Sequence, residues 1–161
     1  PMLHFLALHV ESIVEIGVRN CYSTSAFLLA KKELWSIDLN TSPVIEALQT
    51  ENLPNWHFIQ GDSTSDEVAN QLPDFFDMLF IDGLHTYNQV KKELETYHKS
   101  VNKFIAFHDT ALHSQGAYSR DIVGQTGILP AIGEFLMDNP EWRIVYSVEF
   151  NHGLTVLERS N

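Results

Sequence analysis

Five short apolar segments, each running directly into a polar or acidic residue, constrain the fold of this chain more than any other feature. The segments are residues 12–16, 34–37, 56–59, 78–81 and 103–107, and they lead into Gly17, Asp38, Gly61-Asp62, Asp82 and His108-Asp109. Short runs of this kind, rich in β-branched and aromatic residues, are typical of strands buried in a parallel sheet. Because the carboxyl ends of parallel strands meet at one edge, we expect these polar residues to line a single crevice.

Amphipathic segments alternate with these strands and indicate crossover helices. They are residues 23–32, with Ser23 as the expected cap, and residues 43–50, 65–71, 86–98 and 128–137. Residues 142–148 and 153–157 are typical of a hairpin, and the polar stretch 111–126 of a loop over the crevice. We therefore predict an α/β fold with a doubly wound, Rossmann-like sheet of seven strands, five parallel and then a C-terminal antiparallel hairpin.

The composition favours one domain and argues against several classes of partner. A chain of 161 residues with 44% hydrophobic content suffices for a single core. The formal net charge of −11 repels phosphate backbones and anionic lipid, so we expect neither nucleic acid nor a membrane as partner. A single cysteine, the lack of a long apolar run and the lack of a basic leader indicate a cytoplasmic protein. An upstream segment and a homo-oligomer both stay open.

The first three strand ends carry the signals of a nucleoside-type cofactor. Gly17 would let a ligand approach the backbone beside the positive end of the next helix. Only the first glycine of a Gly-x-Gly-x-x-Gly pattern is present, which argues against a pyrophosphate ligand. Asp38 could accept hydrogen bonds from both ribose hydroxyls, or cap the turn before Pro43. Asp62 with Ser63 could bind an adenine amino group, or cap the next helix.

The fourth and fifth strand ends carry a catalytic signal in Asp82, His85, His108 and Asp109. Carboxylates and imidazoles together suit a divalent cation, which can orient substrate oxygens and make a hydroxyl more acidic. An imidazole also accepts a proton readily near neutral pH. The alternative is that Asp82 caps the helix beginning near Thr86 and that His85 is a surface turn residue. That alternative leaves the His108-Asp109 pair at the neighbouring strand end unexplained.

The motifs at these strand ends resemble those of class I S-adenosylmethionine-dependent methyltransferases. The nearest branch is the cephalosporin-hydroxylase and macrolide-sugar O-methyltransferase group. The matching residues, spread over most of 13–157, are Glu15-Ile16-Gly17 with Ser23-Thr24, Asp38, Gly61-Asp62-Ser63, Asp82-Gly83-Leu84-His85-Thr86-Tyr87 and His108-Asp109-Thr110. The resemblance implies a single methyltransferase-like domain over residues 1–161 that transfers a methyl group from S-adenosylmethionine to a hydroxyl of a small-molecule acceptor.

The resemblance also implies roles for individual residues. Those implied to bind the cofactor are Glu15, Gly17, Ser23, Asp38, Asp62, Ser63 and Asp82. A divalent metal, Mg²⁺ by preference, would be held by Asp82, His108 and Asp109, with His85 as general base. The chain departs from the pattern at Cys21, where relatives often have a further glycine, and at His108, where they often carry Glu or Asp.

These departures keep a second hypothesis open, a catalytically idle domain that binds the cofactor or a nucleotide as a sensor or partner module. A third, a nucleotide-dependent oxidoreductase, is disfavoured by the broken glycine pattern. Tyr87 and Tyr118 could wall an acceptor pocket, and Arg19 and Arg120 could bind an anionic group. The alternative for each of these four is packing or solvated surface.

Overall fold

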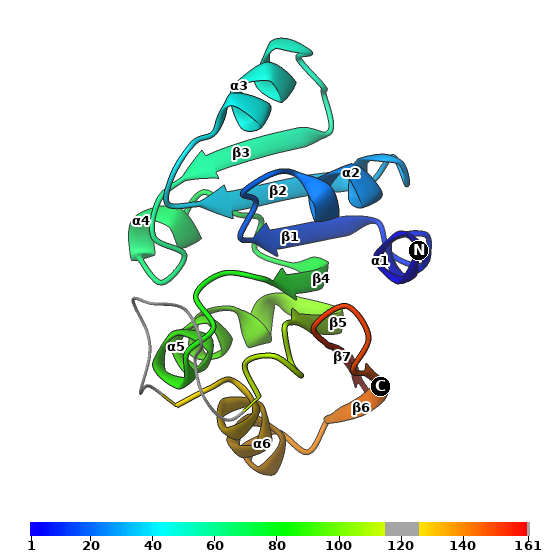
Figure 1. Cartoon of the computed structure of the whole chain (residues 1–161), viewed down its shortest axis with the longest axis vertical. Coiled ribbons are helices and arrows are strands. Elements are labelled where there is room, and N and C mark those ends of the chain that lie inside the picture. Colours follow the sequence, from blue (N-terminus) through cyan, green and yellow to red (C-terminus); the bar gives the residue numbers. More distant parts are fainter. Residues whose placement is uncertain (115–125, 161) are drawn as a thin grey trace.

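The computed structural model describes residues 1–114 and 126–160 and contains a mixed seven-stranded sheet (Figure 1). The strands are β1 (Ser12–Ile16), β2 (Glu33–Asp38), β3 (Trp56–Gln60), β4 (Phe76–Ile81), β5 (Val101–His108), β6 (Trp142–Val148) and β7 (Leu154–Arg159). Their order is β3-β2-β1-β4-β5-β7-β6. Strands β1 to β5 are parallel, and β7 pairs antiparallel with both β5 and β6. The predicted fold class is confirmed.

Helices cover both faces of the sheet. They are α1 (Met2–Ala7), α2 (Tyr22–Leu28), α3 (Pro43–Thr50), α4 (Asp66–Ala69), α5 (Tyr87–Tyr97) and α6 (Leu129–Asp138), with a short 3-10 turn η1 (His98–Ser100). The buried side chains form two clusters. One contains residues of α1, α2 and α3, and the other residues of α4, α5 and α6. The sheet is therefore doubly wound, with a separate core on each face.

Strand β4 shows why the central strands read as unbroken apolar runs. Met78 and Phe80 point into one core, whereas Leu79 and Ile81 point into the other, and all four are at most 3% exposed. Successive strand residues face opposite sides of a sheet, so a strand covered on both faces needs apolar residues at every position. Burying one such side chain contributes roughly 1.5–3 kcal/mol, which makes these strands the stable frame of the site.

The register of the parallel strands brings the strand ends level with one another. Ile16 pairs with Ile37 on one side and with Ile81 on the other, and Ile81 pairs with Phe107. The residues that follow each of these lie at the same height: Gly17, Asp38, Asp82 and His108. On the far side of β5, His108 pairs with Leu154 of the antiparallel strand β7. The turn between β6 and β7 therefore also reaches this edge.

Two local features differ from the sequence-based expectations. Helix α1 was not predicted, because it has six residues and no side-chain cap; the burial of Leu6 and Ala7 stabilises it instead. Ser23 does not cap α2. The N-cap is Cys21, whose backbone is left-handed (φ 57°), and the Ser23 hydroxyl donates to Glu15. The cap prediction was wrong because α2 already begins at Tyr22 and the Ser23 hydroxyl is used as a donor to the buried Glu15.

The predicted loop 111–126 lies partly outside the described residues, which stop at 114 and resume at 126. Tyr118 and Arg120 fall in that gap. Among the helices that the structure does describe, none combines the length and the apolar character needed to cross a membrane.

Candidate active site

A cavity of about 820 Å³ opens at the carboxyl edge of the sheet. One wall is the turn after β1 with the start of α2, including Gly17 and Ser23, and another is the turn after β4, residues 82–85. The end of β5, the β6–β7 hairpin and α1 complete it. Of the predicted site residues, the cavity is lined by Gly17, Ser23, Asp82, His85, His108 and Asp109.

Four of these side chains contact one another in a closed ring. His85 Nε2 lies 3.2 Å from Oδ1 of Asp82 and 3.2 Å from Oδ2 of Asp109. His108 Nδ1 lies 3.3 Å from Oδ1 of Asp82 and 3.1 Å from Oδ1 of Asp109. Each imidazole thus contacts both carboxylates. Asp82 does not cap α5, because that role belongs to Thr86, whose hydroxyl accepts from the amide of Gln89.

The two carboxylates and His108 are strongly coupled. Contact with Asp109 and then Asp82 raises the pKa of His108 to about 10. Burial alone would raise the pKa of Asp82, but His108 and His85 outweigh burial and hold it below its ordinary value. The pKa of Asp109 is lowered in the same way, with burial outweighed by His108 and His85. Both carboxylates therefore favour the ionised form, because the neighbouring histidines stabilise their negative charge.

Two further histidines, left unassigned by the sequence analysis, join this group. Nε2 of His113 lies 3.9 Å from Oδ2 of Asp109, and its ring stacks on that of His85 with centroids 4.7 Å apart. Nδ1 of His152 lies 3.4 Å from Oδ1 of Asp109. The i,i+4 spacing of Asp109 and His113 is a usable local signal. No local signal exists for His152, which arrives through the pairing of β5 with β7.

Gly17 is required by a backbone contact as well as by the cavity it lines. Its φ is +90°, and a Cβ atom there would lie 2.1 Å from the carbonyl oxygen of Asp82. Next to it, the amide of Asp82 donates to the carbonyl of Ile16 at 2.8 Å. The absence of a side chain at Gly17 thus lets the turn after β4 pack against the turn after β1. This contact positions Asp82.

Glu15 supports the first turn from beneath and does not line the cavity. It is fully buried and accepts hydrogen bonds from the hydroxyls of Ser23, Thr24 and Ser36. Burial, only partly offset by these hydroxyls, raises the pKa of Glu15 to about 7. The Glu-x-Gly motif therefore has a structural role here, since it ties α2 to β1 and β2. Ser23, by contrast, both bonds Glu15 and lines the cavity.

Asp38 holds the turn after β1 in place. Its Oδ2 accepts from the amides of Val18 (2.9 Å) and Arg19 (3.0 Å), and its Oδ1 accepts from the amide of Asn40 (3.0 Å). The cap of α3 is Ser42, so Asp38 is not needed for that purpose. Three bonds leave the carboxylate with acceptor capacity to spare. Asp38 is half-buried and does not line the cavity.

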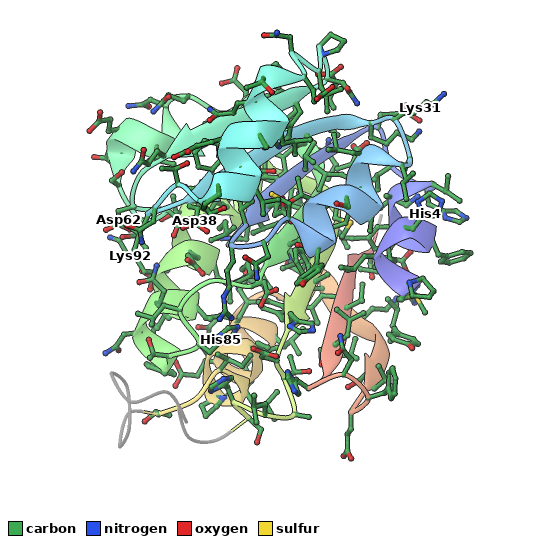
Figure 2. The ribbon with its side chains drawn as sticks, turned by 45° about the horizontal axis from the view of Figure 1, so that its top comes forward. His4, Lys31, Asp38, Asp62, His85 and Lys92 are labelled. Carbon is green, nitrogen blue, oxygen red and sulfur yellow. The ribbon has the colours of Figure 1, made fainter. Side chains whose placement is uncertain are left out.

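Asp62 lies next to Asp38, on the part of the edge away from His85 (Figure 2). The amide of Gly61 donates to the carbonyl of Asp38 at 2.9 Å, which fixes this neighbourhood. Asp62 is exposed and accepts from the amide and the hydroxyl of Thr64, while Ser65 is the cap of α4.

The hydroxyl of Ser63 is buried. It donates to the buried Glu93 at 2.7 Å. Burial, partly offset by Ser63 and Gln89, raises the pKa of Glu93 to about 7. The hydroxyl of Tyr97 donates to the Ser63 carbonyl. Ser63 thus links the turn after β3 to α5.

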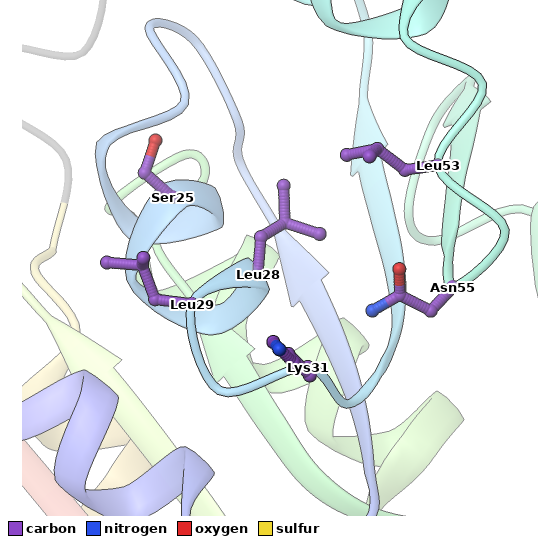
Figure 3. A pocket seen from close by; sticks show the side chains of 6 residues that line it. All are labelled: Ser25, Leu28, Leu29, Lys31, Leu53 and Asn55. Carbon is purple, nitrogen blue, oxygen red and sulfur yellow. The ribbon is translucent and has the colours of Figure 1, made fainter.

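The remaining candidates divide between the cavity and the surface. Arg19 lines the cavity, whereas Tyr87 donates its hydroxyl to Glu134 at 2.6 Å on the outside of α5. A second recess of about 640 Å³ lies between α2 and the segment leading into β3 (Figure 3). Its lining residues are Ser25, Leu28, Leu29, Lys31, Leu53 and Asn55. They lie towards the amino ends of β2 and β3, on the opposite edge from the histidines.

Comparison with known proteins supports an assignment. The methyltransferase domain family matches residues 14–110. No curated protein sequence matches the chain. Among solved structures, a proposed caffeoyl-CoA O-methyltransferase from Staphylococcus aureus is similar, with a TM-score of 0.75 and 18% identity over 99% of this chain and 83% of that one.

Two further structures share the fold, and their names give different types of methyl transfer. An O-methyltransferase from Bacillus cereus, in complex with S-adenosylhomocysteine, has a TM-score of 0.72 and 15% identity over 99% of this chain and 79% of that one. The N-methyltransferase NodS from Bradyrhizobium japonicum has a TM-score of 0.69 and 15% identity over 99% of this chain and 93% of that one.

The family match covers the turn after β1, both strands that carry the aspartates, and Asp109 itself. The resemblance drawn from the motifs is thereby confirmed, and the oxidoreductase hypothesis loses its support. The chain belongs to the methyltransferase domain family and is a class I S-adenosylmethionine-dependent methyltransferase.

Proposed function

We propose that the protein methylates a hydroxyl group of a small-molecule acceptor, with His85 as the base and a divalent cation held by Asp82, His108 and Asp109. One observation carries the proposal. Nε2 of His85 lies 3.2 Å from each of two ionised carboxylates inside the cavity that adjoins the Gly17 turn. A base oriented by carboxylates beside the cofactor turn is what deprotonation of an alcohol requires.

The residues at the sheet edge fit S-adenosylmethionine. The cavity has a volume in the range of small-molecule sites, and Gly17 and Ser23 line the part of its wall that belongs to the turn after β1. Asp38 retains acceptor capacity for ribose hydroxyls, and Asp62 beside it is exposed. When bound, the cofactor supplies an electrophilic methyl group on a sulfonium. We infer that its nucleoside end extends from the cavity across Asp38 towards Asp62.

The residues also fit a divalent cation. Asp82, His108 and Asp109 present ligand atoms that all lie within 4.8 Å of one another. Oδ1 of Asp109 is buried 3.1 Å from Nδ1 of His108, without a well-aligned hydrogen bond from any residue that the structure describes. A bound cation would supply positive charge that orients an acceptor oxygen and lowers the pKa of its hydroxyl. His85 would then receive the proton from that oxygen, with Asp82 and Asp109 stabilising the imidazolium that forms.

The lining of the cavity points to the chemistry of the acceptor. Apolar side chains from the β6–β7 hairpin and from α1 surround the histidines: Met2, Leu3, Tyr146, Val148, Phe150 and Leu154. The net charge of −11 disfavours strongly anionic molecules. We therefore propose an acceptor with an apolar or aromatic body and a hydroxyl, neutral or weakly charged.

The test is a panel assay. The protein is incubated with S-adenosylmethionine and, separately, with phenols, catechols, sugars and matched amines, and formation of S-adenosylhomocysteine is measured with and without EDTA. We expect turnover with at least one hydroxyl acceptor, loss in EDTA, and a fall in kcat of about 10²–10⁴-fold in His85→Ala. His57→Ala is the control, because His57 contacts Glu33 on the surface outside the cavity.

Three outcomes would refute parts of this proposal. Turnover of amines alone would show that the acceptor group is an amine and not a hydroxyl. The N-methyltransferase NodS has the same fold. Full activity in EDTA would show that the reaction needs no cation. Full activity in His85→Ala would show that His85 is not the base.

A further inference from the structure

We propose a second cation position, formed by His85, Asp109 and His113, that binds a divalent transition ion such as Zn²⁺ in preference to Mg²⁺. It shares Asp109 with the position proposed above but approaches the carboxylate from its other oxygen. The inference rests on the proposed function in one respect only, namely the consequence for His85 described below. The ion binding itself is independent of catalysis.

The geometry brings two imidazoles to one oxygen. Nε2 of His85 and Nε2 of His113 lie 3.2 Å and 3.9 Å from Oδ2 of Asp109. The three residues offer ligand atoms within 4.8 Å of one another. Around a tetrahedral Zn²⁺ with bonds near 2.0–2.1 Å, neighbouring ligand atoms are about 3.3 Å apart, so Nε2 of His113 must move closer to Oδ2 of Asp109 to complete the set.

The rings of His85 and His113 stack beside the carboxylate of Asp109. They are nearly parallel, with an interplanar angle of 9° and centroids 4.7 Å apart. The amide of His113 donates to the carbonyl of Asp109 at 2.9 Å, which places the histidine one turn beyond the aspartate. Because the lone pair on Nε2 lies in the ring plane, a shared ion requires the ring of His113 to turn out of the stack towards Oδ2 of Asp109.

The two oxygens of Asp109 face different histidines. The residue is only 9% exposed, and its Oδ1 lies 3.1 Å from Nδ1 of His108 and 3.4 Å from Nδ1 of His152. Oδ2 is the oxygen that faces His85 and His113, so an ion at the second position would bind Asp109 through Oδ2.

The donor set selects the type of ion. Two imidazoles and one carboxylate, with the cavity leaving further positions open, are the ligands of catalytic zinc sites and of non-haem iron sites. Mg²⁺ prefers an octahedron of oxygens and keeps several waters. The position at Asp82, His108 and Asp109 has two carboxylates and suits Mg²⁺ better. The two positions are therefore expected to differ in ion preference.

Filling the second position would engage the lone pair on Nε2 of His85. That nitrogen could then no longer accept a proton from the acceptor. If His85 is the base, Zn²⁺ at this position therefore inhibits methyl transfer.

Calorimetry on the chelator-treated full chain tests the ion preference. Zn²⁺ and Mg²⁺ are titrated separately into the wild type, His113→Ala, Asp82→Asn and His152→Ala. We expect His113→Ala to weaken Zn²⁺ binding at least tenfold and to leave Mg²⁺ unchanged, and Asp82→Asn to affect Mg²⁺ more than Zn²⁺. His152→Ala is the matched control. It removes an imidazole from the same cavity that contacts the other oxygen of Asp109, and we expect no change for Zn²⁺.

A second measurement protects against misfolding of the variant. Co²⁺ added to the wild type is expected to give paramagnetically shifted N–H resonances from His85 and His113; these two signals should be absent in His113→Asn at the same Co²⁺ concentration, whereas any signal from His108 at the first position should remain. Equal Zn²⁺ affinity in the wild type and a folded His113→Ala, or no Zn²⁺ binding by the wild type, would overturn the inference. Zn²⁺ binding without any methyl transfer would instead overturn the proposed function and leave this site standing.

Discussion

Nε2 of His85 lies 3.2 Å from Oδ2 of Asp109, although the two residues follow different strands and are separated by a helix and a strand in the sequence. The contact exists because Ile81 and Phe107 are paired neighbours in β4 and β5, so the residues beyond them emerge side by side. The base and the shared carboxylate are thus held by strand register and by the rigid core beneath it. Changes at Asp109 should consequently act on ions and on the base together.

Replacing Asp109 with asparagine tests that coupling. The change removes the charge that both proposed ion positions use, so we expect Zn²⁺ and Mg²⁺ affinities to fall at least tenfold and kcat to fall with them. Affinity for S-adenosylhomocysteine should change little, since Asp109 contacts no residue of the turn after β1 among the interactions described. Calorimetry and the panel assay measure both quantities. The exposed Asp138 of α6 gives the control, Asp138→Asn, and unchanged ion binding in Asp109→Asn would contradict the prediction.

Replacing Gly17 with alanine should destabilise the fold and displace Asp82. The new Cβ would lie 2.1 Å from the carbonyl of Asp82, and φ +90° is unfavourable for any side chain. We expect a loss of at least about 2 kcal/mol in the free energy of unfolding, measured by urea denaturation.

Gly133→Ala is the matched control for that substitution. Gly133 lies inside α6, and a Cβ there meets nothing within 4 Å. Alanine should therefore stabilise the helix by about 0.5–1 kcal/mol. Equal effects of the two substitutions would show that the contact between Gly17 and Asp82 is not tight.

The pH dependence of stability should reveal the buried Glu15. Its pKa is about 7 in the folded chain and near 4.5 when exposed, so the folded state binds more protons between these values. Stability from this group is complete below pH 4.5 and is lost as the pH rises to 7, by on the order of 3 kcal/mol.

Glu15→Gln should flatten the slope between pH 4.5 and 7, because glutamine does not titrate. Glu93, whose pKa is also raised to about 7, contributes a second component of the same sign. Glu15→Gln should therefore remove part of the slope, and Glu15→Gln with Glu93→Gln most of it. Urea denaturation at each pH measures this, and an unchanged slope in the double variant would show that these carboxyls are not protonated in the folded chain.

Replacing Asp38 with alanine should weaken cofactor binding. The change removes two hydrogen bonds to the turn after β1, from the amides of Val18 and Arg19, and one from the amide of Asn40 after β2, together with the proposed ribose contact. We expect the Kd of S-adenosylhomocysteine to rise about tenfold or more, as judged by calorimetry. Asp62→Ala should have a smaller effect, because Asp62 is exposed and its carboxylate accepts from Thr64, outside the turn after β1. An Asp38→Ala protein with wild-type affinity would exclude Asp38 from the cofactor site.

The fold was largely predictable because its signals are local. The boundaries of β1, α3 and β6 agree with the predicted segments 12–16, 43–50 and 142–148. Each is marked by residues within it or directly beside it, as Ser42 and Pro43 mark the start of α3. Helix α1 lacks such signals and depends on distant partners, which is why its sequence does not reveal it.

The site was predictable only where a residue directly follows a strand. Asp82, His85, His108 and Asp109 meet as predicted, because parallel register determines where strand ends lie. His152 depends on how an antiparallel hairpin returns, and Ser63 on which buried carboxylate, Glu93, it faces. Contacts of this kind depend on which distant segments pair in the fold, and neither residue type nor sequence spacing predicts them.

The hairpin of β6 and β7 has a consequence for how the site forms. The amides of Ala111 and Leu112 donate to the carbonyl of His152, and a Cβ at Gly153 would lie 2.2 Å from the Ala111 amide nitrogen. The chain beyond Asp109 is therefore clamped by a segment some forty residues later. Strands β1 to β4 form the scaffold beside which the cofactor is proposed to bind. The surroundings of Asp109, however, take their shape only when β6 and β7 pair with β5. Ion affinity at Asp109 should therefore report that folding is complete.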